Sequence, residues 1–340
     1  MLTLVELANH LDGVWHGNAN HAIFSLSSLA RATSNDLAYF DNPLFQSVLS
    51  STRAGAVLLK SEHVNGCPVN CIAVPEPLEA MFKVSRLLPN LNPIDTTGIH
   101  PTAQVHRSVQ IGQRSSVGAN SVIGEKVQLN DDVTIGSNTT IESSVCIGKN
   151  SRIGSGVIIH SGTLIGQSVI IDSGCIIGAA PFNHYKDHGV WQQGLVIGGV
   201  VICQGTQIGA NTVIDRGSVG DTYLDEGVCV DNLVLIAHDV YIGKNTAVAG
   251  CAAIGALAQI GSDCIIGGAS CLAANIHLTN DVVISGMSTV TKSITRSGIY
   301  SSGTTVHDHS RWRRNTARFK RLDDYITKLI TIEKKLNNNN

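Results

Sequence analysis

Aromatic and charged side chains are both scarce in this sequence of 340 residues, at 4% and 15% of the chain, and the formal net charge is only -2. A nearly neutral chain gives no electrostatic reason to expect binding to nucleic acid or to a membrane surface. No uninterrupted apolar run approaches the ~18 residues that predict a transmembrane helix, and Met1 is not followed by the basic and apolar segments of a secretory signal. We therefore expect a cytoplasmic protein without a transmembrane segment.

The nine cysteines do not have the paired spacing of a zinc site. Seven of them fall within the repeat that is described next, namely Cys146, Cys175, Cys203, Cys229, Cys251, Cys264 and Cys271. We interpret them as small buried apolar residues rather than as a disulfide framework. The cysteines therefore predict no metal site.

The chain does have an aliphatic residue at every sixth position over more than half of its length. The series runs without a gap from Ile99 to Ile177, resumes at Ile202, takes an insertion of four residues, and continues from Leu224 to Val290. Neither an α-helix nor an alternating strand has this period. A hexapeptide repeat predicts a parallel β-helix, a β-solenoid in which each unit is a short strand and a turn. With three faces, roughly 18 residues form one coil and about ten coils stack.

The residues that follow the aliphatic position predict the corners of this β-helix. Many units place a glycine there, as in Ile111-Gly112 and Ile123-Gly124, and others place Asn, Asp or Ser. These residue types tolerate unusual backbone angles. We therefore expect the corner conformation directly after the aliphatic residue.

The repeat divides the chain into three predicted parts. Residues 1–98 lack it and predict a small α/β domain, residues 99–293 form the β-helix, and residues 294–340 form a helical extension. Within the first part, Thr3 and Glu6 have the spacing of a capping box, which predicts a helix that begins there. Residues 89–97 are expected to be a linker.

Two aromatic residues, Tyr39 and Phe45, bracket Asn42 in the first domain. An amide both donates and accepts hydrogen bonds, as the planar edge of a base requires, and aromatic rings offer stacking faces. Core aromatics beside a turn at Pro43 are the alternative interpretation. These residues by themselves leave both open.

A long segment interrupts the repeat between Ile177 and Ile202. Because a solenoid places extra residues on its outside, such an insertion is typical of a functional loop. His184 and His188 lie in it, but zinc needs three or four convergent ligands. We interpret the loop as a wall over a groove between neighbouring β-helices, with no metal.

His238 lies two positions after the aliphatic Ile236, which places it on the outer surface of the β-helix rather than in its axis. Histidine titrates near neutral pH, so it can accept a proton from an attacking amine or hydroxyl group. A surface histidine at a corner without a chemical role is the alternative.

The C-terminal part begins with a basic stretch that contains no acidic residue. Its cationic side chains are Arg311, Arg313, Arg314, Arg318, Lys320 and Arg321. This stretch predicts either a solvated helix face or a dock for an acidic partner. After it, apolar residues from Leu322 to Leu336 alternate by three and four, which indicates helices that associate.

These parts, in this order, resemble the UDP-3-O-(3-hydroxyacyl)glucosamine N-acyltransferases of lipid A biosynthesis over nearly the full length. The repeat by itself indicates only the wider hexapeptide acyltransferase superfamily. The more specific motifs are Tyr39 to Phe45, Ile214 to Gly217, Asp231-Asn232, Ile236 to His238 and Gly298 to Gly303.

The resemblance implies a left-handed β-helix and a homotrimer with active sites in the grooves between adjacent subunits. It implies transfer of a 3-hydroxyacyl chain from the phosphopantetheine arm of acyl carrier protein to the 2-amino group of the UDP-sugar, with no other cofactor. His238 matches the general base of the family. Tyr39, Asn42 and Phe45 match its uracil pocket, and residues 311–321 match its carrier-protein dock.

The resemblance also suggests supporting residues and shows departures. Asp231, with Asn232 beside it, or Asp239 is expected to orient the His238 imidazole. Asn275 stands where the family has a second histidine, and His277 follows two residues later. Two other departures are the loop of residues 178–183, which lacks a family carboxylate, and Leu235, where the family often has Gln. A sugar-nucleotide acyltransferase with another acceptor or a coenzyme A donor, and a non-catalytic paralogue, therefore stay open as alternatives.

Overall fold

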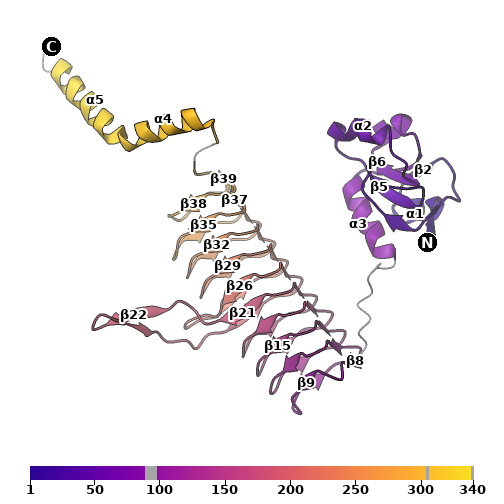
Figure 1. Ribbon diagram of the computed structural model, residues 1–340, viewed down its shortest axis with the longest axis horizontal. Helices are drawn as coiled ribbons and strands as arrows, with labels where there is room; N and C mark the ends of the chain where they lie inside the picture. The colour runs from indigo at the N-terminus through magenta and orange to yellow at the C-terminus, as the bar shows by residue number, and fades with distance from the viewer. Residues whose placement is uncertain (89–97, 304–305, 338–340) are drawn as a thin grey trace. The chain divides into compact units, whose positions relative to one another are not determined.

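The computed structural model describes residues 1–88, 98–303 and 306–337 (Figure 1). It divides into two compact units, Met1–Asp95 and Thr96–Asn340, which are described separately. The linker expected over residues 89–97 lies outside the described residues.

The first unit is built on a five-stranded sheet. One edge strand, β2 (Val14–His16), is antiparallel to its neighbour, and the other strands are parallel. In spatial order the strands are β2, β7 (Asn70–Ala73), β6 (Ala56–Leu59), β5 (Asp36–Tyr39) and β4 (Ser25–Leu26). A short antiparallel pair joins β1 (Leu2–Thr3) to β3 (Ala22–Ile23). The helices are α1 (Leu4–His10), α2 (Gln46–Leu49) and α3 (Pro77–Leu87), with 3-10 turns η1 (Pro43–Phe45) and η2 (Ser61–Gly66).

Both faces of this sheet are covered. Leu37, Leu58 and Ile72 pack with residues of α1 and α3 on one face, whereas Val57 and Cys71 belong to a second buried cluster on the other. The alternation follows from the two-residue period of strand side chains. Helix α1 begins at the predicted capping box, because Thr3 and Glu6 exchange hydrogen bonds.

The second unit contains the predicted β-helix, whose three parallel sheets form the faces of a prism (Figure 1). The eleven-stranded sheet consists of β8 (Gly98–Ile99), β11 (Ser116–Val117), β14 (Thr134–Ile135), β17 (Arg152–Ile153), β20 (Ile170–Ile171), β25 (Gln207–Ile208), β28 (Cys229–Val230), β31 (Ala247–Val248), β34 (Ile265–Ile266), β37 (Val282–Ile284) and β39 (Gly298–Tyr300). The ten-stranded sheet consists of β9 (Gln104–Val105), β12 (Val122–Ile123), β15 (Thr140–Ile141), β18 (Ile158–Ile159), β21 (Ile176–Ala179), β26 (Val213–Asp215), β29 (Leu235–Ile236), β32 (Ala253–Ile254), β35 (Cys271–Leu272) and β38 (Thr289–Val290). The nine-stranded sheet consists of β10 (Gln110–Ile111), β13 (Gln128–Leu129), β16 (Cys146–Ile147), β19 (Leu164–Ile165), β24 (Val200–Ile202), β27 (Thr222–Leu224), β30 (Tyr241–Ile242), β33 (Gln259–Ile260) and β36 (His277–Leu278).

The aliphatic ladder forms the core of the β-helix. Each strand pairs with the strand one coil away, so Val117 lies beside Ile135 and Ile135 beside Ile153, and all three are buried. The other residue of each two-residue strand points outward. The predicted fold class, a parallel β-helix with a small α/β domain before it and helices after it, is confirmed.

The corner conformation lies later in each unit than expected. The left-handed backbone occurs three residues after the aliphatic position, as at Asn120 (φ 57°) and Asn138 (φ 56°), and not directly after it. The glycine that follows the aliphatic residue has a different function, which is spatial. A Cβ atom on Gly136 would lie 2.5 Å from the backbone nitrogen of Ser155 in the next coil, so the absence of a side chain allows this close approach.

All nine cysteines are free. Cys175 and Cys264 are buried as predicted, but the prediction is wrong for Cys229, Cys251 and Cys271, which are exposed. The physical reason is their position in the unit. Cys229 and Cys271 take the outward place of a strand, and Cys251 takes the left-handed corner position with φ 60°.

The end of the β-helix lies beyond the predicted boundary at residue 293, because β39 pairs with β37 in the eleven-stranded sheet. Two helices follow, α4 (His309–Lys320) and α5 (Leu322–Asn337). In the described part of the chain, no helix has the length and apolar character that a membrane span requires.

Candidate active site

Two insertions and His238 occur in successive coils at one corner of the prism. At this corner, called the ten-to-nine corner here, the chain passes from the ten-stranded to the nine-stranded sheet. The long loop follows β21, the four-residue insertion follows β26, and His238 follows β29. These strands are neighbours in the sheet, since Ile177 pairs with Ile214 and Ile214 with Ile236. Stacking of coils therefore brings together segments that are separate in the sequence.

The His238 imidazole is held by the next residue in the chain. Its Nδ1 lies 2.6 Å from Oδ2 of Asp239. The two side chains are 12% and 11% exposed, so His238 lies outside the axis as expected but is largely covered. When Nδ1 donates its proton to the carboxylate, Nε2 is left with the lone pair and can act as a base.

The carboxylate of Asp239 is in turn held by the insertion after β26. Oδ2 accepts hydrogen bonds from the Ser218 amide (2.9 Å) and hydroxyl (2.5 Å), and Oδ1 accepts one from the Gly220 amide (3.0 Å). Burial opposes ionisation, but the hydrogen bonds from Ser218, His238 and Gly220 outweigh it and lower the pKa of Asp239 to about 2. Asp239 is therefore a fixed anion beside the imidazole.

A second carboxylate lies one coil earlier at the same corner. Asp215 ends β26, next to the inward-pointing Ile214, and is half-buried. Burial raises its pKa to about 6, and the nearby His238 opposes that shift. Within residues 1–88, 98–303 and 306–337, no side chain or backbone group forms a hydrogen bond with the Asp215 carboxyl group.

The next residue, Arg216, fastens the long loop. Its Nε donates to the carbonyl oxygen of Gly198 at 2.8 Å, and its Nη2 lies 3.5 Å from the carbonyl oxygen of Ser161. The guanidinium group thus connects the end of the loop to the preceding coil. The central part of the loop is a two-stranded hairpin, β22 (His184–Asp187) and β23 (Val190–Gln193).

The hairpin carries exposed aromatic side chains and the two histidines noted in the sequence. Phe182 lies 5.0 Å from the His184 ring and 6.5 Å from the Trp191 ring, measured between centroids. His188 lies at the turn with φ 46°. Among the described residues, no group of three or more His, Cys, Asp or Glu side chains could hold a metal ion.

Asp231 and Asn232 lie at a different corner from His238. They follow β28 of the eleven-stranded sheet, where Asp231 accepts a hydrogen bond from the Gly250 amide at 2.9 Å and Asn232 accepts one from the Ala210 amide at 2.7 Å. These contacts connect adjacent coils. Of the two acidic residues expected to orient the imidazole, the structure therefore favours Asp239.

Asn275 lies at the same corner as His238, two coils further along the ten-stranded sheet. Its backbone is left-handed (φ 57°) and its side chain is exposed. At about 4.8 Å per coil, this places it roughly 10 Å along the axis from His238. His277 is also exposed, in β36 of the nine-stranded sheet.

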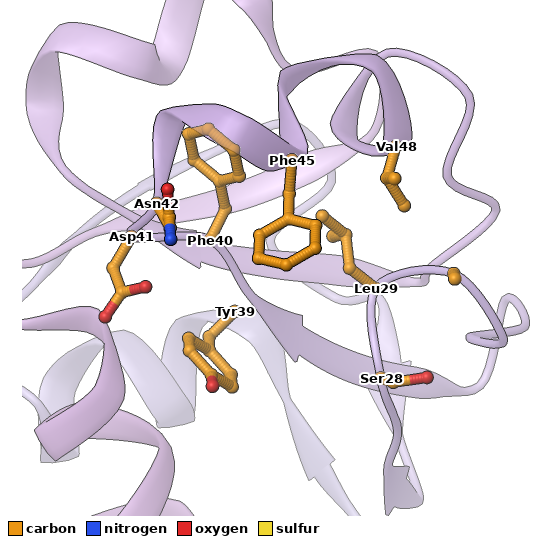
Figure 2. Close-up of a pocket in the computed structure, with 9 residues that line it drawn as sticks. Ser28, Leu29, Tyr39, Phe40, Asp41, Asn42, Phe45 and Val48 are labelled. Atoms are coloured by element: carbon orange, nitrogen blue, oxygen red, sulfur yellow. The ribbon is translucent and has the colours of Figure 1, made fainter. Parts of the chain in front are cut away.

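The first unit contains a separate cavity of about 270 Å³ beside β5 and η1. It is lined by Ser28, Leu29, Ala30, Tyr39, Phe40, Asp41, Asn42, Phe45 and Val48. Figure 2 shows Asn42 and Phe45 on one side of this space and Tyr39 across from them. The structure therefore brings the three predicted uracil-binding residues to one cavity.

The motif was interpreted either as a base-binding site or as core aromatics beside a turn. The structure supports each interpretation at a different residue. Phe40 is the core aromatic, 2% exposed and in edge contact with His63. Phe45 is 55% exposed and free to stack. The side-chain oxygen Oδ1 of Asn42 accepts from the Leu44 amide at 3.0 Å and caps η1, which leaves the side-chain nitrogen Nδ2 to donate to a ligand.

The basic residues of the C-terminal part lie on and just after α4, and all are exposed. Asp308 caps the helix by accepting from the Arg311 amide at 3.0 Å. Arg321 differs from the other cations, because its guanidinium lies over the Tyr325 ring and near Asp324. The remaining cations, Arg311, Arg313, Arg314, Arg318 and Lys320, have no ion pair within the described part of the chain.

Ser218, Gly220 and Asp215 were not predicted from the sequence as site residues. The four-residue insertion after Ile214 could have indicated them, because extra residues in a solenoid must lie outside it. A second imidazole and carboxylate pair was also missed. His160 Nδ1 lies 3.2 Å from Glu142 Oε1, at the same corner and on adjacent coils.

Comparisons with known proteins identify the chain as an acyltransferase. Residues 20–87 match the family model for UDP-3-O-(3-hydroxymyristoyl) glucosamine N-acyltransferase, LpxD, and residues 94–187 match that for the GMPPB C-terminal domain. The UDP-3-O-acylglucosamine N-acyltransferase of Pseudomonas syringae pv. tomato is 35% identical over 98% of this chain and 95% of its own length. The protein of that name from Coxiella burnetii is 36% identical over 98% and 97%. The chain therefore belongs to the UDP-3-O-acylglucosamine N-acyltransferase family.

A solved structure from another family is similar in outline. The UDP-N-acetylglucosamine acyltransferase of Arabidopsis is 21% identical, with a TM-score of 0.45 over 64% of this chain and 76% of its own.

Proposed function

We propose that the protein transfers a 3-hydroxyacyl chain from acyl carrier protein to the 2-amino group of UDP-3-O-(3-hydroxyacyl)glucosamine, a step of lipid A biosynthesis. The observation that carries this proposal is the His238–Asp239 pair, whose Nδ1 and Oδ2 atoms are 2.6 Å apart in a largely covered site. The names of the relatives support the acceptor. The carrier-protein donor rests on the resemblance of the sequence to the family.

In this mechanism His238 is the general base. Its Nε2 accepts a proton as the amine attacks the thioester carbonyl carbon, so that the C–N bond forms and a tetrahedral oxyanion develops. Collapse of this intermediate breaks the C–S bond, and the imidazolium returns the proton to the departing thiolate. The Asp239 anion stabilises the imidazolium throughout. No covalent enzyme intermediate is needed, because both substrates are bound together.

The cavity of the first unit is proposed to bind the uracil base. Phe45 and Tyr39 offer stacking faces, and the free amide nitrogen of Asn42 can donate to a uracil carbonyl oxygen. This division assigns nucleotide binding to one unit and proton transfer to the other.

The donor protein is proposed to dock on the exposed cations of α4, since an acidic carrier complements them. Its phosphopantetheine arm would present the thioester, so no further cofactor is required. We also propose a homotrimer, in line with the family, and a cytoplasmic location, where nine free thiols are stable.

The decisive test is an assay of the purified protein with the UDP-sugar acceptor and a panel of 3-hydroxyacyl carrier-protein thioesters. We expect transfer in the natural protein and its loss, by about 10²–10⁴-fold, in His238→Ala. His106→Ala is the matched control, because His106 follows β9 at the same corner, six coils away, and among the described residues its ring bonds only to Ser108. Undiminished turnover in a folded His238→Ala protein would remove the mechanism.

A further inference from the structure

Asp215 belongs to the Ile214 to Gly217 motif, and the mechanism above does not use it. Its strand β26 pairs with β29, so Asp215 lies one coil before the segment that carries His238. Ile214 is buried in the axis, and side chains alternate along a strand, so Asp215 points out of the axis. The carboxyl group is therefore at the same corner as the proposed base, on the outer side of the β-helix.

The hydrogen-bond donors around this corner are already committed to other acceptors. The Ser218 and Gly220 amides donate to Asp239, and Arg216 donates to the carbonyl oxygens of Gly198 and Ser161. Asp239 thus receives several donors, whereas Asp215 receives no hydrogen bond from any residue that the structure describes. The Asp215 oxygens are in contact with solvent, since no buried side-chain oxygen of the described residues lacks a partner. A half-buried carboxyl group in this state beside a base can accept a hydrogen bond from a ligand.

We propose that Asp215 determines selectivity for an amine acceptor by accepting a hydrogen bond from the second N–H of the attacking nitrogen. This inference rests on the proposed function. An amine that gives one proton to His238 still has another N–H, which the Asp215 carboxylate can accept. A hydroxyl acceptor has a single O–H, which His238 takes, so the carboxylate would remain unpaired.

Asp215 is a positioning residue in this scheme and is not consumed. The C–N bond forms, the C–S bond breaks and one proton passes from nitrogen through His238 to sulfur, while the Asp215 carboxylate keeps its charge. Its contact fixes the orientation of the nitrogen lone pair toward the carbonyl carbon. Burial raises the pKa of Asp215 to about 6, so the carboxylate form prevails above that pH and is available as an acceptor. Sites that hydrogen-bond a particular substrate group discriminate strongly against analogues that lack it.

The test compares two acceptors, the UDP-3-O-acylglucosamine and its analogue with a 2-hydroxyl in place of the 2-amino group. In Asp215→Asn we expect kcat/KM for the amine to fall by about 10–100-fold, the usual effect of a charge-assisted hydrogen bond, with at most a two-fold change for the hydroxyl analogue. Asp172→Asn is the matched control, because Asp172 follows the aliphatic Ile171 as Asp215 follows Ile214, but lies exposed at another corner. We expect no change in that variant.

The binding constants of the two acceptors, measured without donor, provide a second readout. The natural protein should bind the amine more tightly than the hydroxyl analogue, and Asp215→Asn should lose that difference. Two ratios compare the amine with the hydroxyl analogue, one of kcat/KM values and one of binding constants. If Asp215→Asn leaves both ratios unchanged, the inference is overturned. Asp215→Ser is the substitute if the Asn variant does not fold, as judged by circular dichroism. By contrast, a natural protein that acylates neither acceptor would refute the proposed function, while the binding ratio would still test Asp215.

Discussion

The His238 Nδ1 atom lies 2.6 Å from Oδ2 of Asp239, the residue that follows it in the chain. Adjacent residues form this pair because Asp239 has a left-handed backbone (φ 56°), which turns its side chain back toward the imidazole. The same carboxylate accepts from Ser218 in the preceding coil. The site is therefore a product of coil stacking, which makes its parts separately testable.

The first prediction concerns Asp239 itself. In Asp239→Asn the imidazole loses its anionic partner, and we expect kcat to fall by about 10²–10⁴-fold while the acceptor binding constant changes little. Asn tolerates the left-handed backbone, so the fold should persist. Asp263→Asn, another left-handed aspartate (φ 55°) at a different corner, is the control in steady-state kinetics. Equal kcat values in the two variants would argue against a role for the carboxylate.

Asp239 should also affect acid stability. Its pKa is lowered to about 2, so its hydrogen bonds stabilise the fold fully above the ordinary value of 3.8 and are lost as the pH falls through about 2. The shift corresponds to roughly 2 kcal/mol. Urea unfolding midpoints between pH 4.5 and 2 should therefore decline more steeply in the natural protein than in Asp239→Asn. Parallel declines would show that the carboxylate is not held as the structure indicates.

The sequence predicts the inward residues of the β-helix because one physical requirement, burial in the axis, repeats every six positions. Ile214 and Ile236 are identified in this way, and with them the outward position of His238. Asp231 and Asp239 were both expected as partners of His238, and the sequence could not decide between them, because the position of the Asp239 carboxylate depends on how the insertion after β26 folds against it. The same register would have placed Cys229 and Cys271 outside, because each directly precedes an inward aliphatic residue, but the expectation of burial was based on residue type alone.

The next prediction separates two functions of Asn42, which caps η1 and is proposed to contact uracil. Asn42→Ser keeps a capping oxygen but removes the amide donor, so we expect unchanged thermal stability and about a ten-fold weaker affinity for a uridine nucleotide. Leu44→Ala, at an 87% exposed neighbour, is the control in titration calorimetry. Full affinity in Asn42→Ser would exclude the amide from the nucleotide site.

A pair of adjacent residues tests the ladder of the β-helix. Ile236 is fully buried and Leu235, in the same strand, is 46% exposed. We expect Ile236→Ala to lower the free energy of unfolding by about 2–5 kcal/mol, because it leaves a cavity in the axis. Leu235→Ala should change it by about 0.5 kcal/mol or less. Urea denaturation followed by circular dichroism measures both, and similar costs would contradict the assignment of inward and outward positions.

The last prediction is that Asp215, the proposed selectivity residue, lowers the free energy of unfolding at neutral pH. The pKa of Asp215 is raised to about 6 from an ordinary 3.8, so between these values the unfolded chain loses its proton before the folded protein does. Stability contributed by this group therefore falls as the pH rises through that window, and the loss is complete above about pH 6. Asn does not titrate, so Asp215→Asn should be more stable than the natural protein at pH 7.5, with the difference disappearing near pH 4. We expect about 1 kcal/mol, because solvent screens part of the shift at this half-buried group. If Asp215→Asn gains stability at pH 7.5 and loses amine selectivity, the fold tolerates an unpaired carboxylate because the substrate needs it. If the urea midpoints of the variant and the natural protein are equal at both pH values, Asp215 lies in an ordinary solvated environment.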